Sequence, residues 1–192
     1  WDIPLLSPID SLTTFMFLSK SQLARNNQKI VYGFLPYWNT GTYTTGTNKG
    51  EPRFTIQKEL THLGYFSLTL GADGSFVSSV DGELDMGLHR LNSDAFATIS
   101  NDLDDENKKL ELVVSQFNHG DISYFLNSEN AQDNFIQSLD NVFLAYPFSG
   151  INIDIETSGE TDEKMRQNLT NFIIKLRKHL DEKYGHVQLS ID

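Results

Sequence analysis

Five short segments rich in β-branched and aromatic residues recur along the chain, and each predicts a β-strand. They begin near Ile30 (IVYGFLPYW), His62 (HLGYFSLTL), Leu110 (LELVVSQF), Gly150 (GINIDIE) and Val187 (VQLSI). Their starts are about 40 residues apart, which leaves room for a helix in each interval of a β/α unit. The spacing therefore favours strands that alternate with helices.

Apolar residues at the 3–4 spacing of an amphipathic helix predict three helices between these strands. The clearest covers residues 160–183, a second covers 129–145, and a weaker third covers 93–108. Alternating strands and helices indicate a parallel α/β sheet with right-handed crossovers. We expect a (β/α)8 TIM-barrel type of fold of which this chain covers about strands 1 to 5, since eight such units need roughly 300 residues. The alternative is a complete five-stranded doubly wound domain.

The remaining stretches suggest a lead-in segment and two loops. Residues 1–28 are expected to precede the barrel, whose N-terminal part would cover 29–192. Residues 39–52 and 71–90 are rich in Gly, Thr and Asp and are expected to be loops, with a small hairpin at Asp73-Gly74. Because the sequence begins at Trp1 and not at Met, we expect an upstream segment to have been removed and the protein to be secreted or extracytoplasmic.

Charge and composition narrow the class of ligand. The formal charge is 15 − 26 = −11, which opposes binding to nucleic acid or to an anionic membrane and suits a neutral ligand. The chain has no cysteine, so disulfides and thiolate chemistry are excluded. No apolar run approaches the ~20 residues of a membrane span. The histidines lack metal-ligand spacing, and we expect neither a metal nor a cofactor.

Residues 149–156 read Ser-Gly-Ile-Asn-Ile-Asp-Ile-Glu and carry the clearest chemical signal. On an extended strand three isoleucines face one way, and Asn152, Asp154 and Glu156 face the other. The two acidic residues would have Cα atoms roughly 7 Å apart, close enough to share a proton or one substrate group. A half-exposed antiparallel strand with its acids in water would show the same alternation.

If the strand is instead central and parallel, the isoleucines meet helices and the acids point into the barrel. Desolvation then raises the pKa of the carboxyls, and so close a pair holds two charges with difficulty. We expect a protonated Glu156 beside an ionised Asp154 at the end of the strand. That arrangement suits general acid catalysis on a glycosidic oxygen.

The segment GINIDIE resembles the fourth-strand signature DGxDxDxE of glycoside hydrolase family 18. That family holds chitinases, endo-β-N-acetylglucosaminidases and some peptidoglycan-cleaving enzymes. The resemblance extends to IVYGFLPYW as first strand, LTHLGYFSL as second, the helix leading into the signature, and KYGHVQLSI before the fifth strand. Together these matches cover residues 29–191.

The resemblance implies a TIM barrel and a glycosidase that cleaves β-1,4 linkages of N-acetylglucosamine-containing glycans such as chitin, peptidoglycan or N-glycan cores. Glu156 matches the family's proton donor. Asp154 matches the acid that holds the substrate's 2-acetamido group while its oxygen attacks the anomeric carbon, with retention of configuration. This mechanism is substrate-assisted and requires no enzyme nucleophile.

The match is incomplete in two places. Ser149 replaces the first Asp of the signature, and Asn152 replaces the middle one. The side chain of Asn152 could hydrogen-bond Asp154, but it cannot take up a negative charge. Ser115 aligns with the serine of the third-strand SxGG motif, but Gln116-Phe117-Asn118 follows it in place of the Gly-Gly pair. The family's sixth and eighth strands supply a Tyr and a Trp of the cleft, so the isolated chain is expected to be nearly inactive.

Three aromatic residues are expected in the sugar-binding cleft. Phe34 and Tyr65 align with aromatic positions at its floor, and Trp38 lies where the first strand opens towards it, although single aromatics more often fill a core. Two other readings stay open: a non-hydrolytic, lectin-like barrel of the same family, and an unrelated α/β scaffold whose acids bind a divalent metal. We also expect self-association through the edges of the sheet.

Overall fold

The computed structural model describes residues 29–42, 58–80, 83–159 and 161–192. The expected lead-in at 1–28 and most of the loop at 39–52 lie outside these ranges. The chain divides into Trp1–Ile30 and Val31–Asp192, and every helix and strand below belongs to the second unit.

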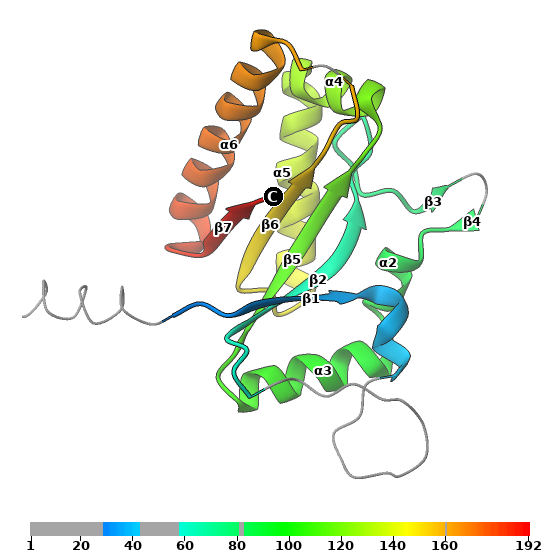
Figure 1. The fold of residues 1–192 in the computed structure, drawn as a ribbon, viewed down its shortest axis with the longest axis vertical. Helices are drawn as coiled ribbons and strands as arrows, with labels where there is room; N and C mark the ends of the chain where they lie inside the picture. Colours follow the sequence, from blue (N-terminus) through cyan, green and yellow to red (C-terminus); the bar gives the residue numbers. More distant parts are fainter. Residues whose placement is uncertain (1–28, 43–57, 81–82, 160) are drawn as a thin grey trace, which may run out of the picture. The chain divides into compact units, whose positions relative to one another are not determined.

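A five-stranded parallel sheet organises this unit (Figure 1). Its strands are β1 (Tyr32–Pro36), β2 (His62–Thr69), β5 (Lys109–Gln116), β6 (Gly150–Ile155) and β7 (Gln188–Ile191). Each lies in a segment predicted to be a strand. The order β1-β2-β5-β6-β7 follows the chain without reversal. A doubly wound sheet reverses its strand order at a switch point, so the doubly wound alternative is wrong and the barrel-type order is confirmed.

Three helices follow the predicted periodicity: α3 (Asp94–Asp105), α5 (Glu129–Ala145) and α6 (Glu163–Tyr184). Each begins at a side-chain cap that accepts a hydrogen bond from a backbone N–H of the first turn, Ser93 for α3, Ser128 for α5 and Asp162 for α6. Helix α6 ends at Gly185, whose φ of 71° favours glycine. The capping residues thus fix the start of each predicted helix.

Several short elements were not expected from the sequence. They are the 3-10 helix η1 (Tyr37–Thr42), the helices α2 (Met86–Arg90) and α4 (His119–Asn127), and the antiparallel pair β3 (Ser79–Val80) and β4 (Glu83–Leu84). The stretch 71–90 is therefore only partly a loop. The expected turn at Asp73-Gly74 is present, because an antiparallel bridge joins Leu70 to Phe76 across it.

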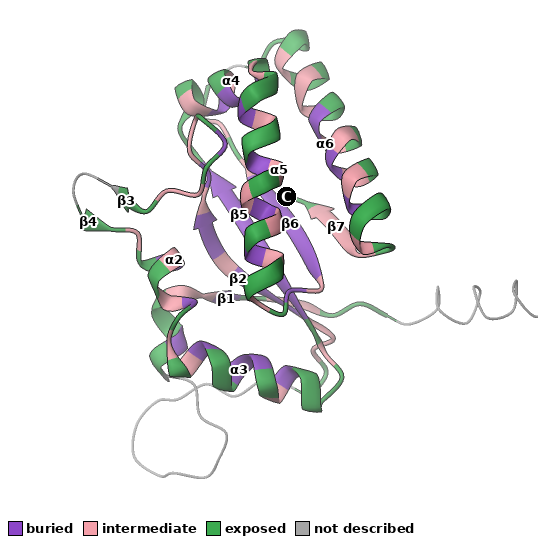
Figure 2. Cartoon of the chain, turned by 180° about the vertical axis from the view of Figure 1, so that it is seen from behind, coloured by how far each residue is buried: buried purple, intermediate pink, exposed green. Residues whose placement is uncertain are grey.

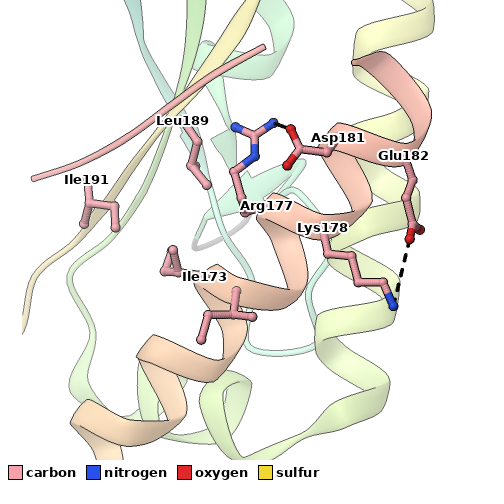
Figure 3. Close-up of a pocket in the computed structure, with 8 residues that line it drawn as sticks. Ile173, Arg177, Lys178, Asp181, Glu182, Leu189 and Ile191 are labelled. Carbon is pink, nitrogen blue, oxygen red and sulfur yellow. Dashed lines mark hydrogen bonds and ion pairs between the residues drawn. The ribbon is translucent and has the colours of Figure 1, made fainter. Parts of the chain in front are cut away.

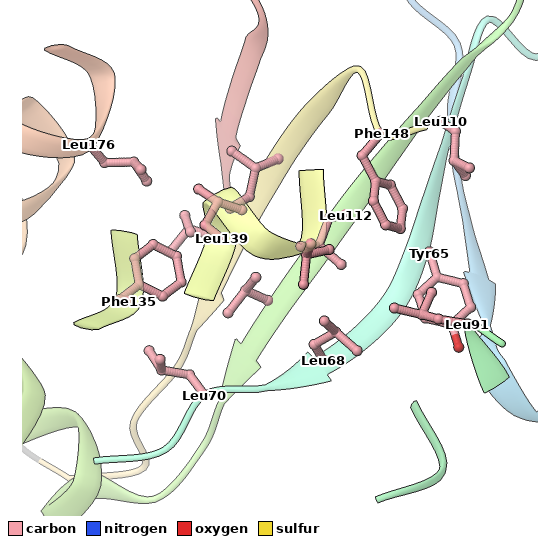
Figure 4. Packing of buried hydrophobic residues seen from close by; sticks show 14 of the residues in the cluster. Tyr65, Leu68, Leu70, Leu91, Leu110, Leu112, Phe135, Leu139, Phe148 and Leu176 are labelled. Atoms are coloured by element: carbon pink, nitrogen blue, oxygen red, sulfur yellow. The ribbon is translucent and has the colours of Figure 1, made fainter. Parts of the chain in front are cut away.

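The hydrophobic core lies between one face of the sheet and the helices. Figures 1 and 2, taken from opposite sides, place α5 and α6 over the same face of the strands. Ile151 and Ile153 are 0% and 1% exposed and belong to this core, as the alternation of residues 150–155 predicts. Phe135 of α5 and Leu176 of α6 belong to this core (Figure 4). The rings of Phe135 and Phe172 pack together, with their centroids 5.4 Å apart.

The opposite face of the sheet carries polar side chains. Strand register aligns Val113 with Asn152 and Ser115 with Asp154, so these residues share the face that the helices do not cover. Glu111 lies on the same face, beside the start of β6, and is 0% exposed. Neither of its carboxylate oxygens has a hydrogen-bond partner among the described residues. Its neighbour His62 lies 3.8 Å away, from Nε2 to Oε1, which is too far for a hydrogen bond.

Glu111 is expected to make the stability of the protein depend on pH. Burial, only partly offset by the nearby Tyr32 hydroxyl, raises the pKa of the Glu111 carboxyl from 4.5 to about 7. The folded state therefore holds the proton more tightly than the unfolded state, and stability falls as pH rises from about 4.5 to 7. Glu111→Gln should escape this loss. The difference in unfolding free energy between Glu111→Gln and wild type should therefore shift in favour of the variant by about 3 kcal/mol as pH rises from 4.5 to 8.

Urea unfolding of both proteins at several pH values measures this difference. The matched control is Glu83→Gln, which removes an exposed glutamate of β4 and should leave the pH dependence unchanged. Parallel stability curves for wild type and Glu111→Gln would show that the buried carboxyl does not titrate as described.

An apolar groove lies between α6 and the edge strand β7 (Figure 3). It has a volume of about 640 Å³, and Ile173, Leu189 and Ile191 line it beside ion pairs formed within α6. Strands β1 and β7 are the outer strands of the described sheet. Among the described residues, no helix has the length and apolar character needed to cross a membrane.

Candidate active site

The two predicted carboxylates open into a pocket at the carboxyl ends of the strands. This edge of a parallel α/β sheet is where such folds build their sites. The pocket has a volume of about 570 Å³. Its lining residues are Phe34, Pro36, Trp38, Phe66, Phe117, Asp154, Glu156 and Asp192. The groove beside α6 is larger, but its two acids, Asp181 and Glu182, form ion pairs with Arg177 and Lys178. The smaller pocket is therefore the candidate active site.

Asp154 and Glu156 occupy different environments although only two residues separate them. Asp154 is inside β6 and 6% exposed, whereas Glu156 follows the strand and is exposed to the pocket. The backbone N–H of Glu156 donates to the Gln116 carbonyl at 3.1 Å, which extends the pairing of β6 with β5 by one residue. Oδ1 of Asp154 is buried and has no hydrogen-bond partner among the described residues.

The carboxyl of Asp154 has a raised pKa. Burial, then the charge of Glu156 and a hydrogen bond with its side chain, and last the charge of Asp192, raise the pKa of Asp154 from 3.8 to about 6. Burial is the main cause, because Asp154 lies inside the strand and its charged form is poorly solvated there. The free pocket therefore favours a proton on Asp154 at mildly acidic pH.

Asn152 and Ser115 support the site from the same face of the sheet. Asn152 is 2% exposed and donates from Nδ2 to the Ser190 hydroxyl at 2.9 Å, on the neighbouring strand β7. The Ser115 hydroxyl is buried and forms a 2.7 Å hydrogen bond with Ser67. Neither residue lines the pocket. They tie the strands together beneath it.

Three aromatic side chains form one wall of the pocket. Phe34 and Trp38, both predicted, are 48% and 57% exposed. Phe66 lies between them, with edge-to-face ring contacts to Phe34 at 6.2 Å and to Trp38 at 6.3 Å between centroids. Large exposed rings beside acids give a surface suited to the faces of a sugar ring.

The prediction for Tyr65 is corrected by the structure. Tyr65 is 0% exposed and belongs to the hydrophobic core, where its ring packs edge-to-face on Phe96 and its hydroxyl donates to the Gly87 carbonyl at 2.7 Å. Its register partner is Leu112, another core residue. Because side chains alternate along a strand, the next residue, Phe66, lies on the opposite face and lines the pocket.

Four lining residues were missed from the sequence: Pro36, Phe66, Phe117 and Asp192. Phe66 could have been found from strand parity, since Pro36 and Phe66 are register partners on the face that also carries Phe34. Phe117 is 53% exposed and stands where the family motif would place glycine. No signal in the sequence singled out Asp192.

The arrangement can transfer a proton and hold a polar substituent. Glu156 is an exposed carboxyl that can reach a bound ligand, and Asp154 is a buried hydrogen-bonding group beside it. Two carboxyls placed in this way suit acid–base chemistry. In the described part of the chain, no group of three or more His, Asp or Glu side chains is arranged to hold a metal.

Comparison with known proteins agrees with this architecture. Ostrinia furnacalis Group IV chitinase has a TM-score of 0.63 at 22% identity, with 85% of this chain and 43% of that chain covered. A chitinase from Bacteroides thetaiotaomicron has a TM-score of 0.64 at 18% identity, covering 86% and 46%. The Bacillus cereus spore cortex-lytic enzyme SleL has a TM-score of 0.57 at 18% identity, covering 83% and 34%.

At these identities the structural likeness establishes the fold, and the chain spans less than half the length of each of these proteins. No curated protein sequence matches the chain. The sequence profile described as Glycosyl hydrolases family 18 matches residues 27–191, which is most of the sequence. The chain therefore belongs to glycosyl hydrolase family 18.

Proposed function

We propose that this chain carries the proton donor of a glycosidase that cleaves β-1,4 linkages in N-acetylglucosamine-containing glycans. The observation that carries the proposal is the placement of Asp154 and Glu156 in one aromatic-lined pocket at the end of β6. Family membership and the chitinases and cortex-lytic enzyme of like fold support the same class of substrate. The residues suit substrate-assisted hydrolysis with retention.

In the first step Glu156 gives its proton to the glycosidic oxygen as the bond from that oxygen to the anomeric carbon breaks. The carbonyl oxygen of the substrate's 2-acetamido group forms the new bond to the anomeric carbon, which gives an oxazolinium ion. Asp154 accepts a hydrogen bond from the acetamido N–H and stabilises the positive charge that develops there. No enzyme atom becomes bonded to the sugar.

In the second step a water molecule attacks the anomeric carbon and reopens the ring of the intermediate. Glu156, now ionised, accepts the proton of that water, which restores the starting state of the enzyme. Two inversions at the anomeric carbon give net retention. Because Glu156 is exposed to the pocket, it can reach both the departing oxygen and the incoming water.

Trp38 is the residue on which sugar binding is expected to depend most. Its ring is 57% exposed and held edge-on by Tyr37 and Phe66, so its position is set before a ligand arrives. Trp38→Ala should raise KM for a chito-oligosaccharide about tenfold or more and change kcat much less, since the ring contributes mainly to ground-state binding. Steady-state kinetics of the full-length protein measure both constants.

Tyr124→Ala is the matched control, because Tyr124 is an equally exposed aromatic on α4 that does not line the pocket. It should leave KM unchanged. An unaltered KM in Trp38→Ala would show that the aromatic wall does not bind the sugar.

A substrate panel of chitin oligomers, peptidoglycan fragments and N-glycan cores tests the function itself. Release of reducing N-acetylglucosamine ends from at least one of them is expected. Binding without any product would instead identify a lectin-like protein, although retention of an exposed Glu156 argues for turnover. An extracytoplasmic location, where such polymers are found, and self-association through the outer strands β1 and β7 complete the proposal.

A further inference from the structure

The segment that follows β5 departs from the family's Gly-Gly motif, and its side chains form a set of ties between loops. Gln116 is 7% exposed; its Nε2 donates to the Leu70 carbonyl and its Oε1 accepts from the Asn118 N–H at 2.8 Å. Asn118 caps α4 by accepting from the Asp121 N–H at 3.1 Å. Three successive side-chain contacts therefore hold the segment in one conformation.

His119, the first residue of α4, connects this segment to the loop that carries Glu156. Its Nδ1 lies 2.7 Å from the hydroxyl of Thr157, the residue directly after Glu156. The Thr157 hydroxyl also accepts from the Gly159 N–H at 3.2 Å. A hydroxyl can accept from one group and donate its proton to another, so Thr157 can hydrogen-bond Gly159 and His119 at the same time.

The loop after β6 makes room for this imidazole. A Cβ atom at Gly159 would lie 2.9 Å from Nδ1 of His119, closer than side-chain atoms tolerate. Strand β6 ends at Ile155, and beyond it Glu156 is held by its backbone bond to Gln116. The His119–Thr157 hydrogen bond is the next connection between the same two loops.

We infer that His119 is a positioning residue for Glu156, acting through its hydrogen bond to Thr157. The expected effect of His119 on catalysis rests on the proposed function. Its expected effect on the loop that carries Glu156 rests on the geometry of the hydrogen bond. A displacement of about 1 Å at a reacting group can lower the rate as much as 100-fold. Without the bond, the loop after β6 would keep the Glu156–Gln116 backbone bond but lose its side-chain connection to α4, and Glu156 would sample positions away from the scissile oxygen.

Kinetics of His119 variants in the full-length protein test the catalytic part. His119→Ala should lower kcat about tenfold with KM within about twofold, because His119 does not line the pocket. His119→Asn places an oxygen near the position of Nδ1 and should restore most of kcat, whereas His119→Gln cannot. Thr157→Val should match His119→Ala, and the double variant should be no slower than either.

Amide hydrogen exchange tests the structural part without any need for turnover. The Glu156 amide should exchange about tenfold faster in His119→Ala and Thr157→Val than in wild type. The Ile122 amide, bonded to the Asn118 carbonyl inside α4, should be unchanged, which excludes general loosening of that helix. His186→Ala, at a fully exposed histidine, should alter neither amide.

Unchanged exchange at Glu156 would overturn the inference, and so would additive losses of kcat in the double variant. Absence of turnover in the wild-type protein would instead contradict the proposed function. The exchange measurement would still decide the role of His119 in that case.

Discussion

Replacing Glu156 with Gln is expected to lower kcat for an N-acetylglucosamine oligosaccharide by about 10³-fold with little change in KM. A sugar alkoxide is a poor leaving group, so bond cleavage depends on the proton that the Glu156 carboxyl supplies. The amide of Gln keeps the shape of the side chain but cannot transfer a proton. Steady-state hydrolysis of chitotetraose by the full-length protein measures the loss.

The leaving group separates this explanation from simple damage to the site. A dinitrophenyl glycoside needs little protonation, so Glu156→Gln should lose much less activity on it than on the oligosaccharide. Glu182→Gln removes the same charge from an exposed position on α6, outside the pocket, and should be as active as wild type. Equal losses on both substrates would contradict the role of Glu156 as proton donor.

Replacing Asp154 with Asn is expected to lower kcat by about 10²-fold, the second largest effect. A carboxylate at this position stabilises the positive charge that develops on the acetamido group, and the neutral amide of Asn cannot. The buried setting of Asp154, at 6% exposure, makes this interaction stronger than it would be in water. Steady-state hydrolysis of chitotetraose by the full-length protein measures the loss, with Glu182→Gln as the exposed control.

The pH profile should change with the same substitution. Because the pKa of Asp154 is raised to about 6, protonation as pH falls below 6 removes the charge that the acetamido group needs. Wild-type kcat/KM should therefore fall below an apparent pKa near 6, a value that belongs to the coupled pair of acids. Asp154→Asn should lose this acid limb. If the fall in kcat/KM at acidic pH persists unchanged in Asp154→Asn, it arises from the titration of another group.

Strand identity was predictable because alternation within a parallel sheet leaves a clear pattern. In residues 150–155 the isoleucines occupy the core face and Asp154 the other, as expected from the period of a strand. Helix α5 was predictable at both ends, since its apolar spacing begins after a Ser128 cap and stops before Pro147. Helix α4, with nine residues beginning His-Gly-Asp, has too short a pattern to be distinguished from a loop.

The face on which a single aromatic lies was less predictable. Tyr65 and Phe66 are adjacent and chemically alike, and strand pairing decides between them: Tyr65 aligns with the core residue Leu112, and Phe66 aligns with Pro36 of the pocket. A shift of one residue in this register would exchange the faces of the two rings. The alignment placed Tyr65 in the cleft, whereas Tyr65 lies in the core and the adjacent Phe66 lines the pocket.

The raised pKa of Asp154 could not be predicted from the sequence either. The alternation places Asp154 on the polar face of the strand, but its pKa depends on how deeply the strand buries it. The structure ends β6 at Ile155, which buries Asp154 and leaves Glu156 exposed. The same limit applies to Glu111, which is fully buried inside a sequence that reads as an ordinary strand.

The anomeric form of the first product tests the central claim most directly. Proton NMR of chito-oligosaccharide hydrolysis by the full-length protein, recorded before mutarotation, should show the β-anomer at the newly formed reducing end. Retention follows from attack by the acetamido oxygen that Asp154 holds, followed by water that Glu156 activates. Initial release of the α-anomer would require direct attack by water and would contradict the proposed mechanism.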